Sequence, residues 1–435
     1  MKNKIAIFIA LCASINVSQS FAQFSLTAYI GDVNRSRAGG AAAAEDATTI
    51  YTNPAGLTRL SEDHWTFSAQ TYLSSATFQN QGTVDLLGNP IAGSQGGDGG
   101  SDTIVPSIYY SRELKNGWSF GIAFNTPFGL STEYDRNWVG RYSSIRSGIE
   151  TLNVNPSLGY KITPQWSVGF GANLQWVEAQ LSSAVDFGAI CLANMDFATC
   201  SSLGLLPQSA DGYAEIEGDD WSPGFDFGVL WEGTTTRVGF SYRSKIDHEL
   251  AGSIDFTNPS QASIFAPAFT DTNVEVPITL PEIISVSIYK QVLANFAMMM
   301  DVTHTRWSRI KQFEFHYENP AQPDQTINKD WHDTTRYAIG FDYSLKPVNV
   351  QWGVAYEDSA IPDETFEPSI PISDAIWLNV GAQYMVNKNI SIDLGLVHII
   401  FKERDVNITG QFGETLKGKA KSELNVINTQ LHWIF

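Results

Sequence analysis

Apolar and polar residues alternate strictly through several stretches of the chain, most clearly in residues 166–176 and 221–231. Every second side chain there is apolar, and the positions between them hold mostly Ser, Gly, Asn, Gln or Asp. A period of two predicts β-strands with one apolar and one polar face. The apolar faces consist of Trp166, Val168, Phe170, Ala172, Leu174 and Trp176, and of Trp221, Pro223, Phe225, Phe227, Val229 and Trp231.

A tryptophan stands at each end of both apolar faces. At about 3.3 Å per residue and a tilt near 45°, the distance from Trp166 to Trp176 corresponds to roughly 23 Å across a membrane. An outer-membrane β-barrel has an apolar band about 25 Å tall between two aromatic girdles. A soluble β-sandwich would also alternate, but it gives no reason for a tryptophan at both ends. The spacing therefore favours a transmembrane barrel.

The same pattern predicts an all-β fold of fourteen antiparallel strands, an even number as single-chain bacterial barrels require. Long connectors are expected at 80–101, 128–148, 183–220 and 251–278, on the extracellular side. Four connectors are expected to be tight turns, namely "KNG", "TPQ", "EGTT" and "NKN". The expected strands are 64–79, 102–114, 117–127, 149–163, 165–182, 221–232, 235–250, 279–291, 294–317, 331–345, 348–360, 375–387, 389–404 and 420–435.

The N-terminus has the pattern of a secretory signal peptide over residues 1–22. Lys2 and Lys4 precede a short apolar run, and Ser20-Phe21-Ala22 forms a small-x-small cleavage site. The apolar run is too short for a membrane anchor, which needs about 20 apolar residues. The pattern predicts an exported protein.

Charge and cysteine content limit the kinds of partner and metal site that the chain can have. The chain has 46 acidic residues against 27 Lys and Arg, which argues against binding nucleic acid. Cys191 and Cys200 remain after cleavage, and two cysteines so close in an exported chain predict one disulfide. A metal site would need further ligands nearby, and the sequence offers none.

Catalytic motifs are missing from the sequence. Some of the seven histidines stand next to an aspartate, as His248 does to Asp247. Adjacent side chains point to opposite faces of a strand, which is poor geometry for an acid/base pair. No GxSxG, HExxH, phosphate-binding loop or CxxC motif is present. We expect no enzyme and no cofactor.

Two long connectors hold apolar side chains, although loops in water are normally polar. These residues either pack against each other or form a capture site for an apolar ligand. The candidates for ligand binding there are Leu192, Phe197, Leu205, Ile264, Phe265 and Phe269.

The expected third strand loses its alternation at its end. Thr126, Pro127 and Gly129 follow the regular segment 118–124, and proline cannot donate to a β-ladder. Locally, the strand could simply end at this point.

The stretch "TTIYTNPAGLTRL" at 48–60 contains a helix start before the first expected strand. Asn53 is the expected N-cap and Pro54 the first helical residue. The small residues Ala55 and Gly56 are expected to allow close packing against a barrel wall.

Several segments together resemble the outer-membrane long-chain fatty acid and aromatic hydrocarbon transporter family (FadL-type, OmpP1/FadL/TodX). The resemblance covers nearly the whole mature chain. The segments that carry it are "AGGAAAAEDATTIYTNPAGLTRL" at 38–60, "PFGLSTEYDRNWVGRYSSIRSGIETLNVNPSLGYKI" at 127–162, "LPEIISVSIYK" at 280–290, "DVTHTRWSRIKQF" at 301–313 and "VAYEDSAIPDETFEPSIPISDAIWLNVGAQY" at 354–384.

This resemblance implies a barrel over 63–435 in the outer membrane of a Gram-negative bacterium, with residues 23–62 folded into the lumen as a hatch. The family's hatch motif falls on Asn53, Pro54, Ala55 and Gly56. Apolar ligands are expected to enter between extracellular loops, to reach a pocket near Phe24 and Leu26, and to leave sideways at a kink in the third strand. The kink candidates are Gly121, Asn125, Thr126, Pro127, Phe128 and Gly129.

The expected partners follow from this reading. They are a long-chain fatty acid or aromatic hydrocarbon, outer-membrane lipid and lipopolysaccharide, and the barrel-assembly machinery, whose recognition signature the terminal Phe435 resembles. Arg141 or Arg146 could meet a fatty-acid carboxylate, although for either residue the sequence favours a solvated loop charge. The alternative is a non-specific porin or a structural or adhesive outer-membrane protein.

Overall fold

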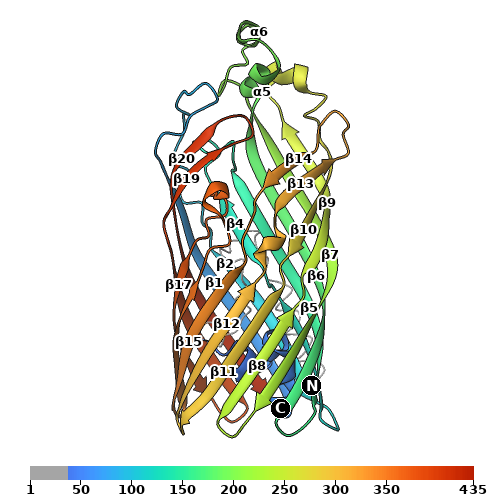
Figure 1. The fold of residues 1–435 in the computed structure, drawn as a ribbon, viewed down its shortest axis with the longest axis vertical. Helices are drawn as coiled ribbons and strands as arrows, with labels where there is room; N and C mark the ends of the chain where they lie inside the picture. The colour runs from blue at the N-terminus through green and yellow to red at the C-terminus, as the bar shows by residue number, and fades with distance from the viewer. Residues whose placement is uncertain (1–37) are drawn as a thin grey trace.

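The computed structural model describes residues 38–435, which form a closed antiparallel β-barrel of fourteen strands (Figure 1). The expected signal peptide, Phe24 and Leu26 lie outside the described residues. The barrel closes between its first and last strands, where Trp65 lies opposite Trp433. The predicted fold class is therefore confirmed.

Interruptions divide the fourteen barrel strands into twenty segments. The first segments are β1 (Asp63–Asn80), β2 (Thr103–Glu113), β3 (Trp118–Asn125), β4 (Gly129–Glu133), β5 (Arg146–Lys161), β6 (Trp166–Asp186) and β7 (Asp211–Glu232). The next are β8 (Thr236–Arg243), β9 (Ile246–Thr257), β10 (Thr272–Leu280), β11 (Ile283–Leu293), β12 (Phe296–Thr305), β13 (Gln312–Tyr317) and β14 (Gln325–Asn328). The last are β15 (Thr334–Leu345), β16 (Val348–Glu357), β17 (Ala375–Met385), β18 (Ile390–Phe401), β19 (Arg404–Thr409) and β20 (Thr415–Ile434).

The helices are short, and none in the described part of the chain is long and apolar enough to cross a membrane. Three lie between Gly40 and Arg59: α3 (Gly40–Ala43), α4 (Thr49–Thr52) and η1 (Pro54–Arg59). The others are α5 (Phe187–Asn194), α6 (Phe197–Ser202), η2 (Ser260–Phe265), η3 (Trp307–Arg309) and η4 (Asp363–Thr365).

The tryptophans that bracket the apolar faces of β6 and β7 meet in register. Trp166 lies opposite Trp231, and Trp176 lies opposite Trp221. Between these two rows, Phe170, Leu174 and Phe225 are largely exposed on the outside of the barrel. Exposed apolar side chains between aromatic rows form the belt that faces lipid.

Two of the long connectors are shorter than the sequence predicts. Strand β6 continues to Asp186 and β7 begins at Asp211, so the expected loop 183–220 shrinks to 187–210. The expected loop 251–278 likewise shrinks to 258–271, between β9 and β10. These extensions pair with each other above the lipid belt, as Asp186 does with Asp211. Both of their faces can be polar, so alternation does not reveal them.

Candidate functional site

The segment 38–62 lies inside the barrel and is fixed by Asn53, whose side chain is fully buried. The Asn53 carboxamide oxygen accepts a hydrogen bond from the Ala55 amide at 3.1 Å, which caps η1. Its amide nitrogen donates to the carbonyl of Ala41 at 2.6 Å and to that of Val229 on β7 at 3.1 Å. One side chain therefore joins the helix start, the preceding turn and the wall. We call residues 38–62 the hatch.

Glycines on neighbouring strands make room for the hatch. A Cβ atom at Gly169 would lie 2.2 Å from the carbonyl carbon of Pro54, and one at Gly228 would lie 1.9 Å from Oδ1 of Asn53. Contacts of this kind leave no space for a side chain. We call the following set the glycine seat: Gly121, Gly159, Gly169, Gly228 and Gly239, on β3, β5, β6, β7 and β8.

The expected roles of the small hatch residues need a correction. A Cβ at Gly56 would meet Oγ1 of Thr49 at 2.0 Å, so Gly56 packs against the hatch itself rather than the wall. Ala55 does touch the wall, in a buried cluster with Leu230. Close approach to the wall depends mainly on the glycines of the wall.

The third barrel strand is broken between β3 and β4, and it does not end there. Asn125 pairs with Asn153, and Gly129 pairs with Glu150. Residues 126–128 therefore stand opposite only two residues of β5, which is the geometry of a β-bulge. The hydroxyl of Thr151 accepts a hydrogen bond from the Phe128 amide at 2.9 Å and donates one to the Phe128 carbonyl at 2.7 Å.

The break leaves part of the wall without backbone pairing, and we call this stretch the gap. Strands β2 and β3 pair only from Ile108 and Phe124 towards the periplasmic end. In the described part of the chain, no backbone pairing joins β2 residues 103–107 to β4, which pairs with β5 alone. Of the expected kink residues, Asn125–Gly129 lie at this gap. Gly121 lies in regular pairing before it and belongs to the glycine seat.

The side chain of Phe128 is buried within the barrel. Its ring packs edge-on against Trp307 of η3, with ring centroids 6.0 Å apart. Trp307 in turn contacts Trp331 at 5.5 Å. These aromatic residues belong to the largest apolar cluster of the barrel, and Ile310 and Phe366 belong to it as well. An apolar cluster therefore reaches the gap from inside.

A second connection between hatch and break is polar. Arg243 on β8 donates to the carbonyl of Tyr51 in the hatch at 3.2 Å and to Oδ1 of Asn173 at 2.5 Å. The side-chain amide nitrogen of Asn153 donates to the same Asn173 oxygen at 3.0 Å and to Oδ1 of Asn125 at 3.4 Å. A continuous hydrogen-bonded row thus runs from the hatch to the last residue before the break.

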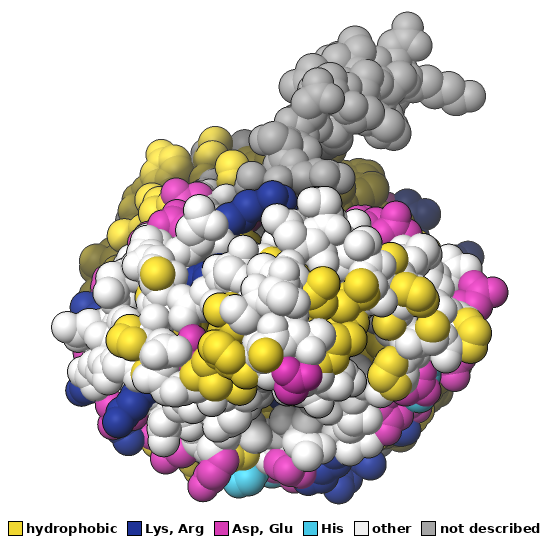
Figure 2. Space-filling view, turned by 90° about the horizontal axis from the view of Figure 1, so that it is seen from above, with side chains coloured by type: hydrophobic (Ala, Val, Ile, Leu, Met, Phe, Trp, Pro, Cys, Tyr) yellow, Lys and Arg dark blue, Asp and Glu magenta, His cyan; other side chains and the backbone are white. Residues whose placement is uncertain are grey.

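Most of the expected ligand-binding residues in the loops pack against each other. Leu205 is fully buried in a cluster with Phe187 and the two cysteines, and Leu192, Phe265 and Phe269 pack around it. Only Phe197 and Ile264 are exposed, at 58% and 45%. Seen from above, apolar side chains gather near the middle of the loop end, with charged side chains mostly towards its rim (Figure 2).

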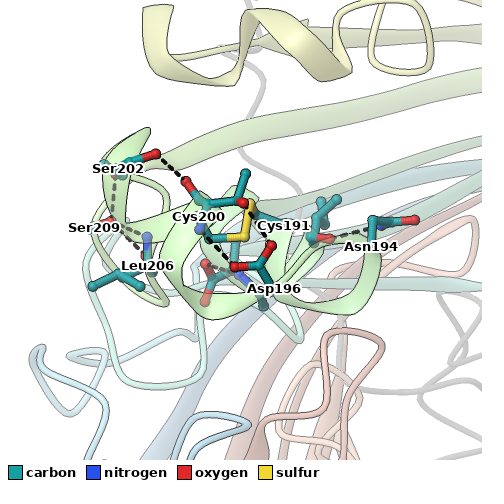
Figure 3. Close-up of a disulfide and its surroundings, with 12 residues drawn as sticks. Cys191, Asn194, Asp196, Cys200, Ser202, Leu206 and Ser209 are labelled. Carbon is teal, nitrogen blue, oxygen red and sulfur yellow. Dashed lines mark hydrogen bonds between the residues drawn. A yellow bond between two sulfur atoms is a disulfide. The ribbon is translucent and has the colours of Figure 1, made fainter.

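A disulfide holds the outermost part of this cluster together. It joins Cys191 of α5 to Cys200 of α6, the helix at the top of the molecule (Figures 1 and 3). The carboxylate of Asp196 caps α6 by accepting from the Thr199 amide at 3.0 Å. The loop is therefore a small folded unit rather than an open groove.

A cavity of about 530 Å³ lies below these loops. It is lined by β5, β6, β7, the β13–β14 hairpin and the loop 358–374. Its apolar lining includes Leu181, Ile216, Phe313, Phe315, Ile327 and Ile370. Phe313 and Ile370 also pack against the cluster that contains Phe128. The apolar lining of the cavity therefore contacts the apolar cluster that reaches the break.

Lys329 is the buried cation of this cavity. Its ammonium group pairs with Glu367 at 2.8 Å and lies 5.5 Å from the centre of the Phe313 ring. Both partners line the same cavity, and the lysine is 4% exposed. The roles of Lys329, Glu367 and Phe313 were not predicted from the sequence. The one local signal is the alternation of Phe313 and Phe315 with polar residues in 312–317.

The two arginines proposed from the sequence differ in the structure. Arg141 is held in place by Asp211 at 2.9 Å and by the Tyr142 hydroxyl, and its guanidinium also donates to the carbonyl of Ala92. These contacts bind loops together and leave little of this cation for a ligand. Arg146 lines the cavity that contains Lys329.

The lipid-facing belt, the hatch in the lumen, the partly apolar cavity and the interrupted wall strand together indicate an outer-membrane barrel of the class that takes up hydrophobic compounds. The family model described as outer membrane protein transport protein (OMPP1/FadL/TodX) matches residues 10–435, and the chain belongs to this family.

Named relatives and solved structures agree with this assignment. The long-chain fatty acid transport protein of Escherichia coli (strain K12) is 26% identical over 448 residues, which cover 96% of each chain. Outer membrane protein P1 of Haemophilus influenzae is 24% identical and covers 84% of this chain and 83% of its own. The fold matches a FadL homologue of Pseudomonas aeruginosa with a TM-score of 0.84 at 21% identity, covering 92% of this chain and 96% of that one. It matches the Pseudomonas putida toluene transporter TodX with a TM-score of 0.69 at 15% identity, covering 89% and 94%.

Proposed function

We propose that the protein takes up long-chain fatty acids, which it captures in the 530 Å³ cavity and releases sideways through the gap beside the third strand. The observation that carries this proposal is the continuity of apolar surface. Phe313 of the cavity packs against the cluster that includes Phe128 at the break. An alkyl chain that follows this cluster avoids the cost of exposing its surface to water.

The periplasmic side of the hatch supports a sideways exit. A cavity of about 340 Å³ there has a polar lining that includes Glu45, Asp46, Asp342, Gln351 and Gln383. An apolar tail gains nothing from carboxylates and carboxamides that are already hydrated. The gap at β2 residues 103–107 opens instead beside the lipid-exposed Ile104 and Phe124. Diffusion down this gradient of apolar surface needs no energy source.

A fatty acid fits the cavity better than a neutral hydrocarbon because of Lys329. A carboxylate head can replace Glu367 as the partner of this buried ammonium group, while the tail lies along Phe313 and Phe315. A toluene molecule would use the apolar wall and leave the ion pair unchanged. The relatives named for fatty acid transport are consistent with this choice.

The test replaces each member of the ion pair in turn. Lys329→Gln should weaken oleate binding about ten-fold, because a charge-assisted contact of about 1.5 kcal/mol is lost. Glu367→Gln should strengthen it, because the lysine loses its competing partner. Toluene binding should change less than two-fold in both variants. Binding is measured on the purified full chain, with thermal unfolding to show that each variant is folded.

A result in which oleate responds to neither substitution would rule out this head-group site. The wider transport proposal has a separate test in uptake of labelled oleate and of toluene by whole cells. If neither enters faster than in a strain without the barrel, transport is wrong, and a structural or adhesive role becomes the better account. Uptake of small sugars at a comparable rate would instead indicate a porin.

We also infer that the C-terminal strand carries the assembly signal. Phe435 directly follows β20 and is 51% exposed, and its ring lies 5.1 Å from that of Trp433. Deleting Phe435 should lower the amount of assembled barrel without changing the affinity of the remaining protein for oleate.

A further inference from the structure

We propose that the outer face of β18–β20 binds the head group of a phosphorylated glycolipid in the outer leaflet. The site combines a row of three lysines with an adjoining polar pocket. The row consists of Lys417, Lys419 and Lys421 on β20, at the upper left of Figure 1. Their neighbours Leu416 and Ala420 are buried, so the lysines project from the outside of the barrel.

The row lies directly above the lipid belt. On the same face of β20, Ile427 and Trp433 are exposed apolar residues of the belt. On β18 the exposed Ile400 pairs with Glu423, which marks the upper edge of the belt on β20. Lys421 is two residues further out, and the other two lysines follow along the strand. Basic residues placed at the edge of a lipid belt meet the phosphates of lipid head groups.

Two of the three cations are available for a ligand. Lys419 is paired with Glu403 at 2.9 Å and with Asp405 at 3.8 Å. Among residues 38–435, no salt bridge involves Lys417 or Lys421. In register, Lys421 faces Thr77 of β1 and Lys417 faces Asn407 of β19, so both have uncharged polar neighbours. Two free ammonium groups thus flank a third whose position is fixed.

The polar pocket continues from the row. It has a volume of about 650 Å³ and lies along β19 and the loop 358–374. Its lining includes Asn407, opposite Lys417, and Asp405, the ion-pair partner of Lys419. Its polar lining holds the hydroxyls of Ser359 and Ser373, the carboxamide of Asn407, five carboxylates and two cations. The carboxylates are those of Asp363, Glu364, Asp374, Glu403 and Asp405, and the cations are Lys402 and Arg404. Such groups bind sugar hydroxyls and would repel an alkyl chain or a bare phosphate.

The outer face of β20 differs in charge from the outer face of β6 and β7. Above the girdle row of Trp176 and Trp221, the outward side chains of β6 and β7 include Glu178, Glu217 and Asp219. An anionic lipid is repelled there and attracted to the lysines of β20. Because phosphate and sugar contacts lie side by side on β18–β20, the occupant that fits is a phosphorylated glycolipid rather than a phospholipid.

The test uses the full chain in detergent and native mass spectrometry with bisphosphorylated lipid A. The variant Lys417→Gln/Lys421→Gln leaves the Lys419 ion pairs intact. We expect its affinity to fall roughly 30-fold, since each lysine near an anionic surface contributes about 1 kcal/mol. The matched control is Lys115→Gln/Lys388→Gln, in the turns after β2 and β17 at the opposite end of the barrel. It should change the affinity less than two-fold.

Two further probes separate sugar from phosphate. Lipid A without phosphates and phosphatidic acid should each bind the unmodified protein at least ten-fold more weakly than bisphosphorylated lipid A. Equal binding of phosphatidic acid would overturn the glycolipid assignment, and equal losses in the variant and the control would overturn the site. Oleate binding should be the same in all three proteins, so the outcome is independent of the transport proposal.

Discussion

Asn53 shows how much one side chain can organise within the hatch. Its three hydrogen bonds satisfy the amide of Ala55 and the carbonyls of Ala41 and Val229, all in the interior of the barrel. A buried polar group that loses its partner costs about 1–3 kcal/mol. An aspartate would keep the cap but could not donate to either carbonyl. This position therefore requires an asparagine, whose carboxamide has both an acceptor oxygen and a donor nitrogen.

Glu414 gives the extracellular loops a dependence on pH. It is 4% exposed in the turn before β20, and its carboxylate accepts from the Phe412 amide at 3.0 Å. Burial raises its pKa to about 7 from an ordinary value of 4.5, and the charge of Asp186 raises it further in the same direction. The folded turn therefore binds a proton more tightly than the unfolded turn does. The resulting stabilisation is complete below pH 4.5 and is lost as the pH rises through 7.

We expect amide hydrogen exchange in residues 410–414 to be slower at pH 5.5 than at pH 8, after correction for intrinsic rates. The difference in local stability should be on the order of 2 kcal/mol. Glu414→Gln should remove most of it, since the carboxamide does not ionise. Equal protection at both pH values in the unmodified protein would contradict this assignment.

At the level of elements, the sequence predicted the positions of those strands whose outer face contacts lipid. Strands such as β6 and β17 must place apolar residues outside and polar residues inside, so alternation located them within a few residues. Where the strands rise above the belt, both faces may be polar, and β7 begins ten residues earlier than alternation indicated. The break at 126–128 was visible as a proline. That the strand resumes at Gly129 depends on pairing with Glu150, which no local pattern encodes.

The glycine seat predicts a specific effect on the hatch. Gly169→Ala or Gly228→Ala places a methyl group against the hatch backbone or Asn53, and overpacking of this kind costs about 1–3 kcal/mol. We expect the hatch to shift and small sugars to enter proteoliposomes faster. Gly148→Ala on β5 is the matched control, because its nearest contact would be an ordinary 3.8 Å. Unchanged sugar entry in the seat variants would show that the hatch does not depend on the seat.

At the scale of the whole molecule, apolar and polar regions are separated along the barrel. The cavity near Phe313 and the cluster around Phe128 form an apolar region, and the lining near Glu45 and Gln351 forms a polar floor. The cavity could not be predicted from the sequence, because its walls come from segments as far apart in the chain as β5 and β19. For loop residues such as Leu205 the sequence left open both mutual packing and ligand capture, and in the structure they pack together. Only tertiary structure distinguishes an apolar loop core from an apolar binding site.

Closing the break tests the sideways route most directly. Deleting Pro127 leaves two residues opposite two on β5, so that β3 and β4 can join into one regular strand and seal the gap along β2. Uptake of labelled oleate is compared in cells that contain equal amounts of assembled barrel, with deletion of Gly82 in the exposed loop after β1 as the control. We expect the Pro127 deletion to reduce uptake at least ten-fold, to the level of cells without the barrel, and the control to take up oleate normally. Normal uptake by an assembled barrel that lacks Pro127 would contradict the account.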